Sequence, residues 1–595
     1  MLLQRLREYG ARTPADIPPR YRRTAVKYMV YLGPHGDPQG VVEQSDGGMS
    51  GKKNRGRALL VPNISRTAAS RANLLVDNAE YALGIPRDPT KAEKAPERHR
   101  LFVEQVRDCA VRTEEPAVQA VLAFLERGVT SELRLPEEFD PSANLSFTVV
   151  IDGEDVRPVD LAAVRRFWAA QKDELGGPSG GGATGGFECL VCGVAGSVER
   201  TLELKVRGIP NGQPTGTALI SANKDAFLSY GLKQSENSPI CGACAEGFSN
   251  ALNGLIADEE TSYRVGAVRS VFWTREPVAG FSWGRLVKEA NAQQVRALLE
   301  SPWRGSAGAT GLDPTPFYAV ALTASGGRAV VRDWLESTVG RAMRNLARYF
   351  VLQELTAWNG EAGPPLPLQR IAGATVRFRS GDNPPAEVPR ALLRLAMTGG
   401  KLPHTLLYEA VRRNRAEQTV RRERAVLIKM VLQSWRDQEG EAWMVDLDRE
   451  NEARMNPDEW SAYLCGRLLA VIEATQRAAL GKVNATVVDR FYGTASSAPM
   501  SVFSTLLRGT RAHLSKLRRD RPRTHTALEG RLMEVLERLP SFPTVLPLAG
   551  QGLFALGYWH QRADDRRAAR EAHARGQTPP IPDDDQDDDE INPEA

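Results

Sequence analysis

The spacing of apolar residues along the chain predicts both strands and helices. Apolar runs bounded by turn residues predict strands at 58–62, 149–153, 217–221 and 317–322. Apolar residues at helical spacing predict helices at 1–9 and 161–171. From Arg328 onward, one stripe follows a period of 3.6, so we expect helices to dominate from there; the stripe is Val331, Trp334, Leu335, Val339 and Met343.

Four of the six cysteines form two Cys-x-x-Cys pairs, Cys189 with Cys192 and Cys241 with Cys244. Four thiolates in two chelating pairs match the tetrahedral demand of zinc, so they predict one structural zinc site. The segment between the pairs is longer than the roughly 15–20 residues of common zinc ribbons, so we expect a folded insert there. The alternatives are one or two disulfides, or a redox Cys-x-x-Cys motif. No signal peptide is recognised that would place the chain in an oxidising compartment.

Charge is unevenly distributed along the chain. The net charge is +4, but residues 583–590 carry seven carboxylates, so the rest of the chain is more basic than the total indicates. A basic body indicates a polyanionic partner, with nucleic acid the obvious candidate and a solvated arginine-rich surface the alternative. The longest apolar run is too short to span a bilayer, so we expect no membrane segment and a cytoplasmic location.

These patterns together predict an α+β protein of several domains. We expect a mixed α/β N-terminal domain, a middle region containing a zinc knuckle, a C-terminal helical bundle and a disordered acidic tail. The expected limits are 1–175 for the N-terminal domain, 176–186 for a glycine-rich linker, 187–327 for the middle region, 328–469 for a helical region, 470–565 for the bundle and 566–595 for the tail.

Basic residues gather in three clusters on separate predicted elements. The first is a glycine-punctuated loop, 51–57, directly before a predicted strand; its candidate contacts are Lys52, Lys53, Arg55, Arg57, Arg66, Arg71 and Asn73. The second, at 412–424, lies on a predicted helix. The third contains Lys516, Arg518, Arg519, Arg521 and Arg523. Cations attract phosphates whatever the base sequence, whereas the amide of Asn73 could read a base edge. The three clusters suggest one long track for a polyanion. The alternatives for the first cluster are a loop free in solvent and a helix-capping role for Asn73.

Common catalytic motifs are missing from the sequence. There is no Walker A loop, no Gly-x-Gly-x-x-Gly after a strand, no His-Glu-x-x-His and no Gly-x-Ser-x-Gly. None of the seven histidines is adjacent to an aspartate. Glu154 and Asp155, beside a predicted turn, are typical of solvated surface. We therefore expect a binding protein and no enzyme.

Several longer strings of residues resemble one family, the large subunit of the type I-C CRISPR Cascade surveillance complex (the Csd family). They run in the family's order and occupy residues 59–62, 73–84, 219–231, 331–336, 489–496, 513–517 and 552–562. The resemblance covers nearly the whole chain except the glycine-rich linker and the acidic tail.

This resemblance implies a non-catalytic subunit of an RNA-guided complex. Such a subunit recognises a short protospacer-adjacent motif (PAM) in duplex DNA, helps to open the duplex and form the R-loop, and offers a platform to a recruited helicase-nuclease. The implied partners are the crRNA-bound backbone and crRNA-processing subunits, the small subunit, target double-stranded DNA and its displaced single strand. A zinc-containing nuclease and a zinc-ribbon DNA-binding regulator are the alternatives.

Overall fold

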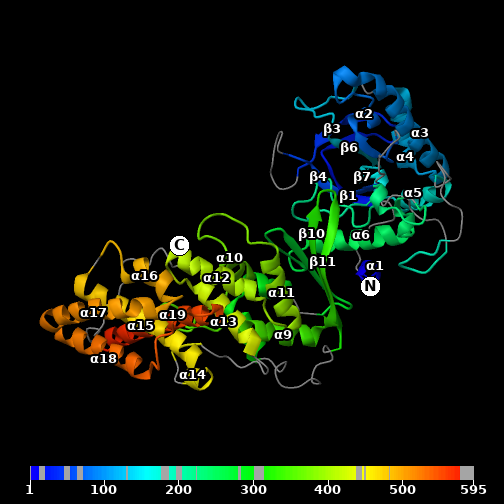
Figure 1. Cartoon of the computed structure of the whole chain (residues 1–595). Coiled ribbons are helices and arrows are strands. Elements are labelled where there is room, and N and C mark those ends of the chain that lie inside the picture. The colour runs from blue at the N-terminus through cyan, green and yellow to red at the C-terminus, as the bar shows by residue number, and fades with distance from the viewer. Residues whose placement is uncertain are drawn as a thin grey trace. The chain divides into compact units, whose positions relative to one another are not determined.

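The computed structural model forms two compact units (Figure 1). Unit 1 consists of residues 1–205 and 220–252, and unit 2 consists of residues 206–219 and 253–595. The structure describes residues 2–12, 21–45, 54–62, 71–128, 132–175, 187–195, 204–222, 224–232, 234–278, 283–300, 314–436, 445–447, 450–481 and 483–576.

Unit 1 is built on a five-stranded mixed sheet with β6 at its centre. β6 pairs with β2 in parallel and with β5 and β7 in antiparallel fashion, while β3 extends the sheet beyond β2. Its residues Leu145 to Val149 are buried on both faces, as expected for a central strand. The strands are β2 (Tyr28–Leu32), β3 (Pro38–Glu43), β5 (Val76–Asn78), β6 (Asn144–Ile151) and β7 (Glu154–Val156).

Two long helices cover β6 in unit 1. Phe102 of α3 and Phe124 of α4 each lie 6.3 Å, between ring centroids, from Phe147 of β6. These three rings belong to one apolar core that joins the sheet to the helices. The helices of this unit are α1 (Leu2–Gly10), α2 (Ala79–Ala82), α3 (Ala95–Thr113), α4 (Pro116–Arg127) and α5 (Ala162–Leu175), with α6 (Gly242–Ala257) beginning here.

Unit 2 contains a four-stranded antiparallel sheet in the order β11-β10-β9-β8. The strands are β8 (Ser262–Val265), β9 (Val268–Thr274), β10 (Pro316–Ser325) and β11 (Arg328–Thr338). We expected helical structure from Arg328 onward, and this prediction is wrong for the first eleven residues, which form β11. Gly326, with φ +57°, closes a tight hairpin that pairs this segment with β10 along its whole length. Helical structure begins only at Val339, where the Thr338 side chain caps α9.

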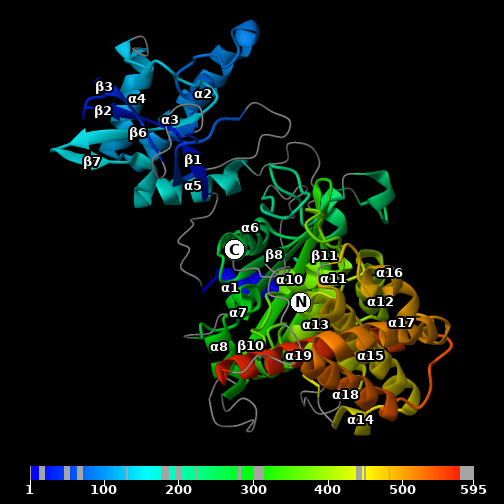
Figure 2. The same cartoon turned by 90° about the vertical axis from the view of Figure 1, so that its left-hand side faces the viewer.

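The rest of unit 2 is helical, and α15 crosses α19 at its centre (Figure 2). Glycine is required at this crossing, because a Cβ atom on Gly466 would lie 1.9 Å from the Phe554 carbonyl oxygen and one on Gly557 would lie 2.0 Å from that of Tyr463. The helices are α7 (Trp283–Glu289), α8 (Ala292–Glu300), α9 (Val339–Val351), α10 (Leu368–Gly373), α11 (Glu387–Thr398), α12 (His404–Glu417), α13 (Arg422–Arg436), α14 (Glu450–Ala453), α15 (Pro457–Leu480), α16 (Val487–Ala495), α17 (Pro499–Asp520), α18 (Pro522–Arg538) and α19 (Leu548–Ala574).

The α+β class is confirmed, with a sheet region toward the N-terminus and helices toward the C-terminus. The strands expected near 58, 149 and 317 and the helices expected near 1 and 161 are present as β4 (Arg57–Pro62), β6, β10, α1 and α5. The segment 217–221 differs: it makes only isolated bridges, from Thr217 to Val206 and from Ala218 to Arg328. α19 continues to Ala574, so residues 566–574, which we assigned to the tail, are helical. The linker 176–186 and residues 577–595 lie outside the described residues.

Candidate metal centre and nucleic-acid interface

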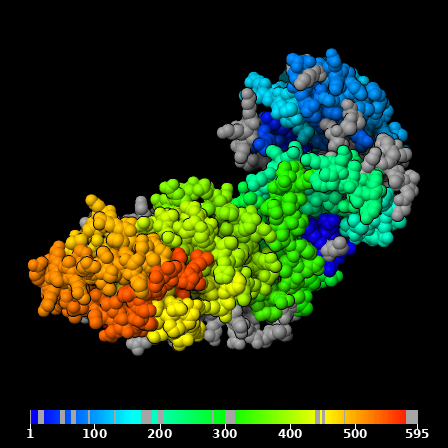
Figure 3. Space-filling model, in the orientation of Figure 1, coloured from blue at the N-terminus to red at the C-terminus, as the bar shows by residue number. Residues whose placement is uncertain are grey.

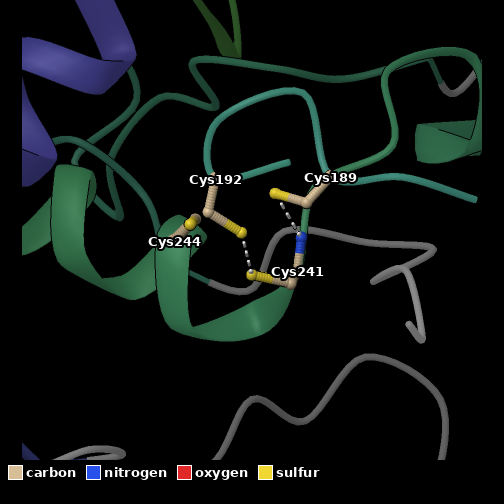
Figure 4. Close-up of side chains that lie close together, drawn as sticks. All are labelled: Cys189, Cys192, Cys241 and Cys244. Atoms are coloured by element: carbon tan, nitrogen blue, oxygen red, sulfur yellow. Dashed lines mark hydrogen bonds between the residues drawn. The ribbon is translucent and has the colours of Figure 1, made fainter. Parts of the chain in front are cut away.

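The two Cys-x-x-Cys pairs come together in unit 1 (Figure 4). All four sulfur atoms lie within 4.8 Å of one another, and Cys192 Sγ is 3.9 Å from Cys241 Sγ. Four sulfurs held at about 2.3 Å from one zinc ion are separated by roughly 3.8 Å, so the cluster has the size of a zinc tetrahedron. All six cysteines of the chain are free of disulfides.

Each cysteine pair is held by its own local structure. The first pair lies in a tight turn in which the Gly193 N–H donates to the Cys189 carbonyl at 2.8 Å. The second pair lies at the start of α6, where the Ala245 N–H donates to the Cys241 carbonyl at 3.0 Å. A bond of 2.9 Å from the Leu190 N–H to the Pro239 carbonyl ties the two pairs together. The long insert between the pairs therefore leaves their geometry intact.

The thiols of this cluster differ in their readiness to ionise. Burial raises the pKa of Cys189, but the backbone N–H groups of Cys241, Cys192 and Val191 donate to its sulfur and bring the pKa down to about 6. The Cys241 N–H donates to this sulfur at 3.4 Å. Burial, with neighbouring thiols, raises the pKa values of Cys241 and Cys244. A bound divalent cation would reverse this increase, because it stabilises thiolates.

The residues fit a structural zinc ion better than a catalytic one. Four thiolates complete a tetrahedral shell, so zinc held by Cys189, Cys192, Cys241 and Cys244 has no open position for water or substrate. Cys189 and Cys244 are 3 % and 1 % exposed, which also closes the site to solvent. When bound, zinc would link the first cysteine pair to the start of α6 through metal coordination.

The N-terminal basic loop leads into a two-stranded ribbon of β1 (Tyr21–Val26) and β4 in unit 1. Asn54 is buried; it donates to Glu43 Oε1 and to the Gln44 carbonyl, both at 2.9 Å. Gly56 has φ +89°, and a Cβ atom there would lie 2.3 Å from the Val26 carbonyl oxygen. Arg55 and Arg57 are exposed beside these anchors and form no ion pair with any described residue.

The other N-terminal candidates are placed as follows. Arg71 is exposed, and Asn73 is half-buried with its N–H donating to Asp77 Oδ2 at 3.1 Å. The cap of the nearby helix α2 is Asn78, whose Oδ1 accepts from the Glu80 N–H, so Asn73 does not cap it. Lys52, Lys53 and Arg66 lie outside the described residues.

The third basic cluster lies on α17 and at the start of α18. Lys516, Arg518 and Arg519 project from α17, while Arg521 and Arg523 follow at the junction; all five are exposed. None of their side chains forms an ion pair within the described part of the chain. Figure 3 shows the surface of this region, in orange, at one end of unit 2. These cations are thus available to an external partner.

The same helix carries two cations that sequence reasoning missed, Arg508 and Arg511. Both are exposed and without an ion pair among described residues. α17 has no acidic residue before Asp520, while its opposite face packs into the core through Leu506, Leu514 and Leu517. The sequence could have indicated these two arginines, because this segment has apolar residues at helical spacing and no carboxylate before Asp520. We name the exposed set Arg508, Arg511, Lys516, Arg518 and Arg519 the α17 cationic face.

The second basic cluster differs, because two of its arginines, Arg412 and Arg424, pair with carboxylates of the protein. Arg424 is buried and pairs with Glu417 at 2.7 Å, and Arg412 pairs with Glu409. Glu423 accepts from Arg370 of α10. This cluster therefore contributes to packing between helices of unit 2.

Comparison with known proteins identifies the class to which these features belong. The chain matches the model of a family of CRISPR-associated proteins over residues 3–565. It belongs to this family, Cas_Csd1, the large subunit of type I-C CRISPR complexes, as the resemblance of its sequence strings predicted. None of the curated proteins compared with the chain matches it. Across the described residues, no helix combines the length and apolar character needed to cross a membrane.

Proposed function

We propose that this Cascade large subunit recognises the PAM, promotes duplex opening and R-loop formation, and offers a platform to a recruited helicase-nuclease. In RNA-guided complexes, base pairing with the guide reads most of the target, and the protein reads only a short adjacent motif. The partners of this subunit would be the crRNA-bound backbone and crRNA-processing subunits, the small subunit, the target duplex and its displaced strand.

The observation that carries this proposal is the α17 cationic face. Some exposed arginines of unit 2, such as Arg285 and Arg575, have a carboxylate partner, whereas the five cations of this face gather on one helix and have none among the described residues. Unpaired like charges on one helix repel one another, so a polyanion would relieve an unfavourable interaction as well as bind. The displaced single strand is the polyanion that duplex opening produces.

The proposed motif reader consists of the N-terminal ribbon with the basic residues that precede and follow β4. Lys52, Lys53, Arg55, Arg57, Arg66 and Arg71 would locate the groove through phosphates, and the amide of Asn73 would discriminate base edges. A two-stranded ribbon is narrow enough to enter a major groove, and Gly56 lets the backbone turn sharply beside it. In this proposal zinc would only stabilise the fold, because it has no open position for substrate, and the protein would not be an enzyme.

Co-expression with the backbone subunits and a crRNA tests the proposal. The large subunit should co-purify with the guide-loaded complex and make its binding to a target depend on the adjacent motif. A large subunit that stays apart from the complex, or one that cleaves DNA by itself with magnesium or manganese, would contradict it.

A further inference from the structure

An exposed loop of unit 1, residues 224–232, carries three large apolar side chains within four positions. Phe227 is 44 % exposed, Leu228 is 37 % exposed and Tyr230 is 98 % exposed. Single apolar residues at the surface are common, but a cluster of exposed apolar side chains on one segment marks an interaction site. We name this loop the apolar tip.

Hydrogen bonds order the apolar tip. Residues Asp225–Phe227 form a turn of 3₁₀-helix, in which the Phe227 N–H donates to the Lys224 carbonyl at 2.9 Å. Asn237 Nδ2 donates to the Phe227 carbonyl at 2.8 Å. Because the backbone is held in this way, the apolar side chains are presented to the outside in a defined arrangement, which lowers the entropy cost of binding.

Tyr230 occupies a backbone conformation that aromatic residues rarely adopt. Tyr230 and Gly231 have φ values of +53° and +72°, and the Leu232 N–H donates to the Ser229 carbonyl at 2.9 Å, as in a type I′ turn. Such turns favour Asn-Gly, so tyrosine costs stability here. Because its side chain is almost fully exposed, packing within the chain does not offset this loss of stability. A strained residue whose side chain faces solvent indicates a role in binding.

Charge indicates the kind of partner. The only charged side chains of the apolar tip are Lys224 and Asp225, whose charges cancel. A nucleic-acid site would need excess positive charge to attract phosphates, as the α17 cationic face has. Phe, Leu and Tyr without net charge instead fit an apolar groove on a protein, where aromatic anchors supply most of the binding energy.

We propose that Phe227, Leu228 and Tyr230 dock into an apolar groove on another protein subunit of the same complex. This inference rests on the proposed function, because it assumes that the chain is a subunit of such an assembly. Residues 234–240 lead from the tip to Cys241, and the bond from the Leu190 N–H to the Pro239 carbonyl ties this segment to the first cysteine pair.

Tyr230→Gly tests the docking role while preserving the fold, since glycine adopts the left-handed conformation freely. We expect the variant to bind the crRNA-loaded backbone assembly at least tenfold more weakly in interferometry, with an unfolding midpoint equal to or above that of the wild type. The matched control is Val111→Ala, which truncates a residue of α3 that is 69 % exposed and should leave affinity unchanged. If the wild type binds the assembly and Tyr230→Gly binds equally well, the docking inference is wrong but the proposed function stands. If the wild type does not bind at all, the proposed function fails.

A photo-crosslinking residue, p-benzoylphenylalanine, placed at position 230 of the complete DNA-bound complex identifies the occupant. A crosslink to a different protein subunit is the expected result. A crosslink to crRNA, to DNA or to a second copy of this chain, or the absence of any crosslink, would overturn the inference.

Discussion

At the scale of single residues, the cysteines show how far sequence reasoning reaches. The two Cys-x-x-Cys pairs are visible as motifs, so their convergence could be predicted although a long insert separates them. The ionisation of the individual thiols could not be predicted, because it depends on backbone N–H groups that only the folded turn directs at Cys189.

The first prediction concerns metal content. Protein purified without chelator should contain about one zinc per chain, because the sulfur cluster matches a tetrahedral shell. Cys244→Ser should lose the zinc and lower the unfolding midpoint of unit 1, since metal binding is coupled to folding. Elemental analysis with thermal unfolding checks both. Cys465→Ala, in the core of unit 2, is the control that should retain zinc; zinc-free wild type would contradict the assignment.

The second prediction concerns Lys429, a charged residue in the core of unit 2 that no sequence pattern marks as buried. It is 1 % exposed, and its Nζ donates to the Leu352 carbonyl at 3.1 Å. Burial lowers the pKa of this amine to about 7, with Glu354 opposing the decrease. The unfolded chain holds the proton up to about pH 10.4, so the folded state is penalised below that pH, fully so below pH 7.

Lys429→Met should therefore stabilise the protein most at neutral pH. Its advantage over the wild type in free energy of unfolding should shrink by roughly 1.4 kcal/mol for each pH unit between 7 and 10. Unfolding measured at several pH values provides the test. Lys288→Met, which removes an exposed amine paired with Glu259, should show little pH dependence relative to the wild type. If the difference in free energy of unfolding between Lys429→Met and the wild type does not change with pH, the lowered pKa of Lys429 is contradicted.

At the scale of elements, the sequence predicts strands well where they are central and helices well where one face is apolar. β10 contains the apolar run Phe317 to Leu322 and β6 ends in Val149 to Ile151, and both strands were predicted. β11 was missed because its apolar residues also fit a helical period, and only pairing with β10 decides between the two. Arg508 and Arg511 were missed because we searched for cations adjacent in the sequence. On a helix, the residues that share a face are three or four positions apart.

The third prediction concerns the α17 cationic face. Arg508→Ala with Arg511→Ala should weaken single-stranded DNA binding by the complex and reduce the slope of log affinity against log salt by about 1.4, since each single-strand phosphate contact contributes roughly 0.7. Affinity should be nearly independent of base sequence. Arg285→Ala with Arg575→Ala removes the same charge from ion-paired positions of unit 2 and is the matched control. Equal slopes for the two double variants would show that α17 is only a solvated face.

At the scale of the whole molecule, domain limits are the least predictable feature. The expected limit at 469 falls within α15, and a single apolar core extends from Tyr263 to Trp559. Trp559 of α19 donates to the Thr356 carbonyl at 2.8 Å, which links the C-terminal helices to the preceding ones. Helices with similar composition on both sides of a limit carry no sequence mark of where one core ends.

In the proposed function, motif reading is assigned to unit 1. Lys52→Ala with Lys53→Ala should weaken binding to all duplex DNA and reduce its salt dependence, because these cations would contact phosphates. Asn73→Ala should instead act on specificity, because one bidentate amide contact to a base is worth about 1–3 kcal/mol of discrimination. The two kinds of variant therefore distinguish general attraction to DNA phosphates from recognition of the motif bases.

The most direct test measures binding of the reconstituted complex to two targets that differ only in the motif beside the protospacer. The account predicts that the wild-type complex strongly prefers the correct motif. With Asn73→Ala the preference should narrow by about 5- to 150-fold while binding to the scrambled target is retained. Discrimination that is unchanged in Asn73→Ala and in Lys52→Ala with Lys53→Ala would contradict the claim that these N-terminal residues of the large subunit read the motif.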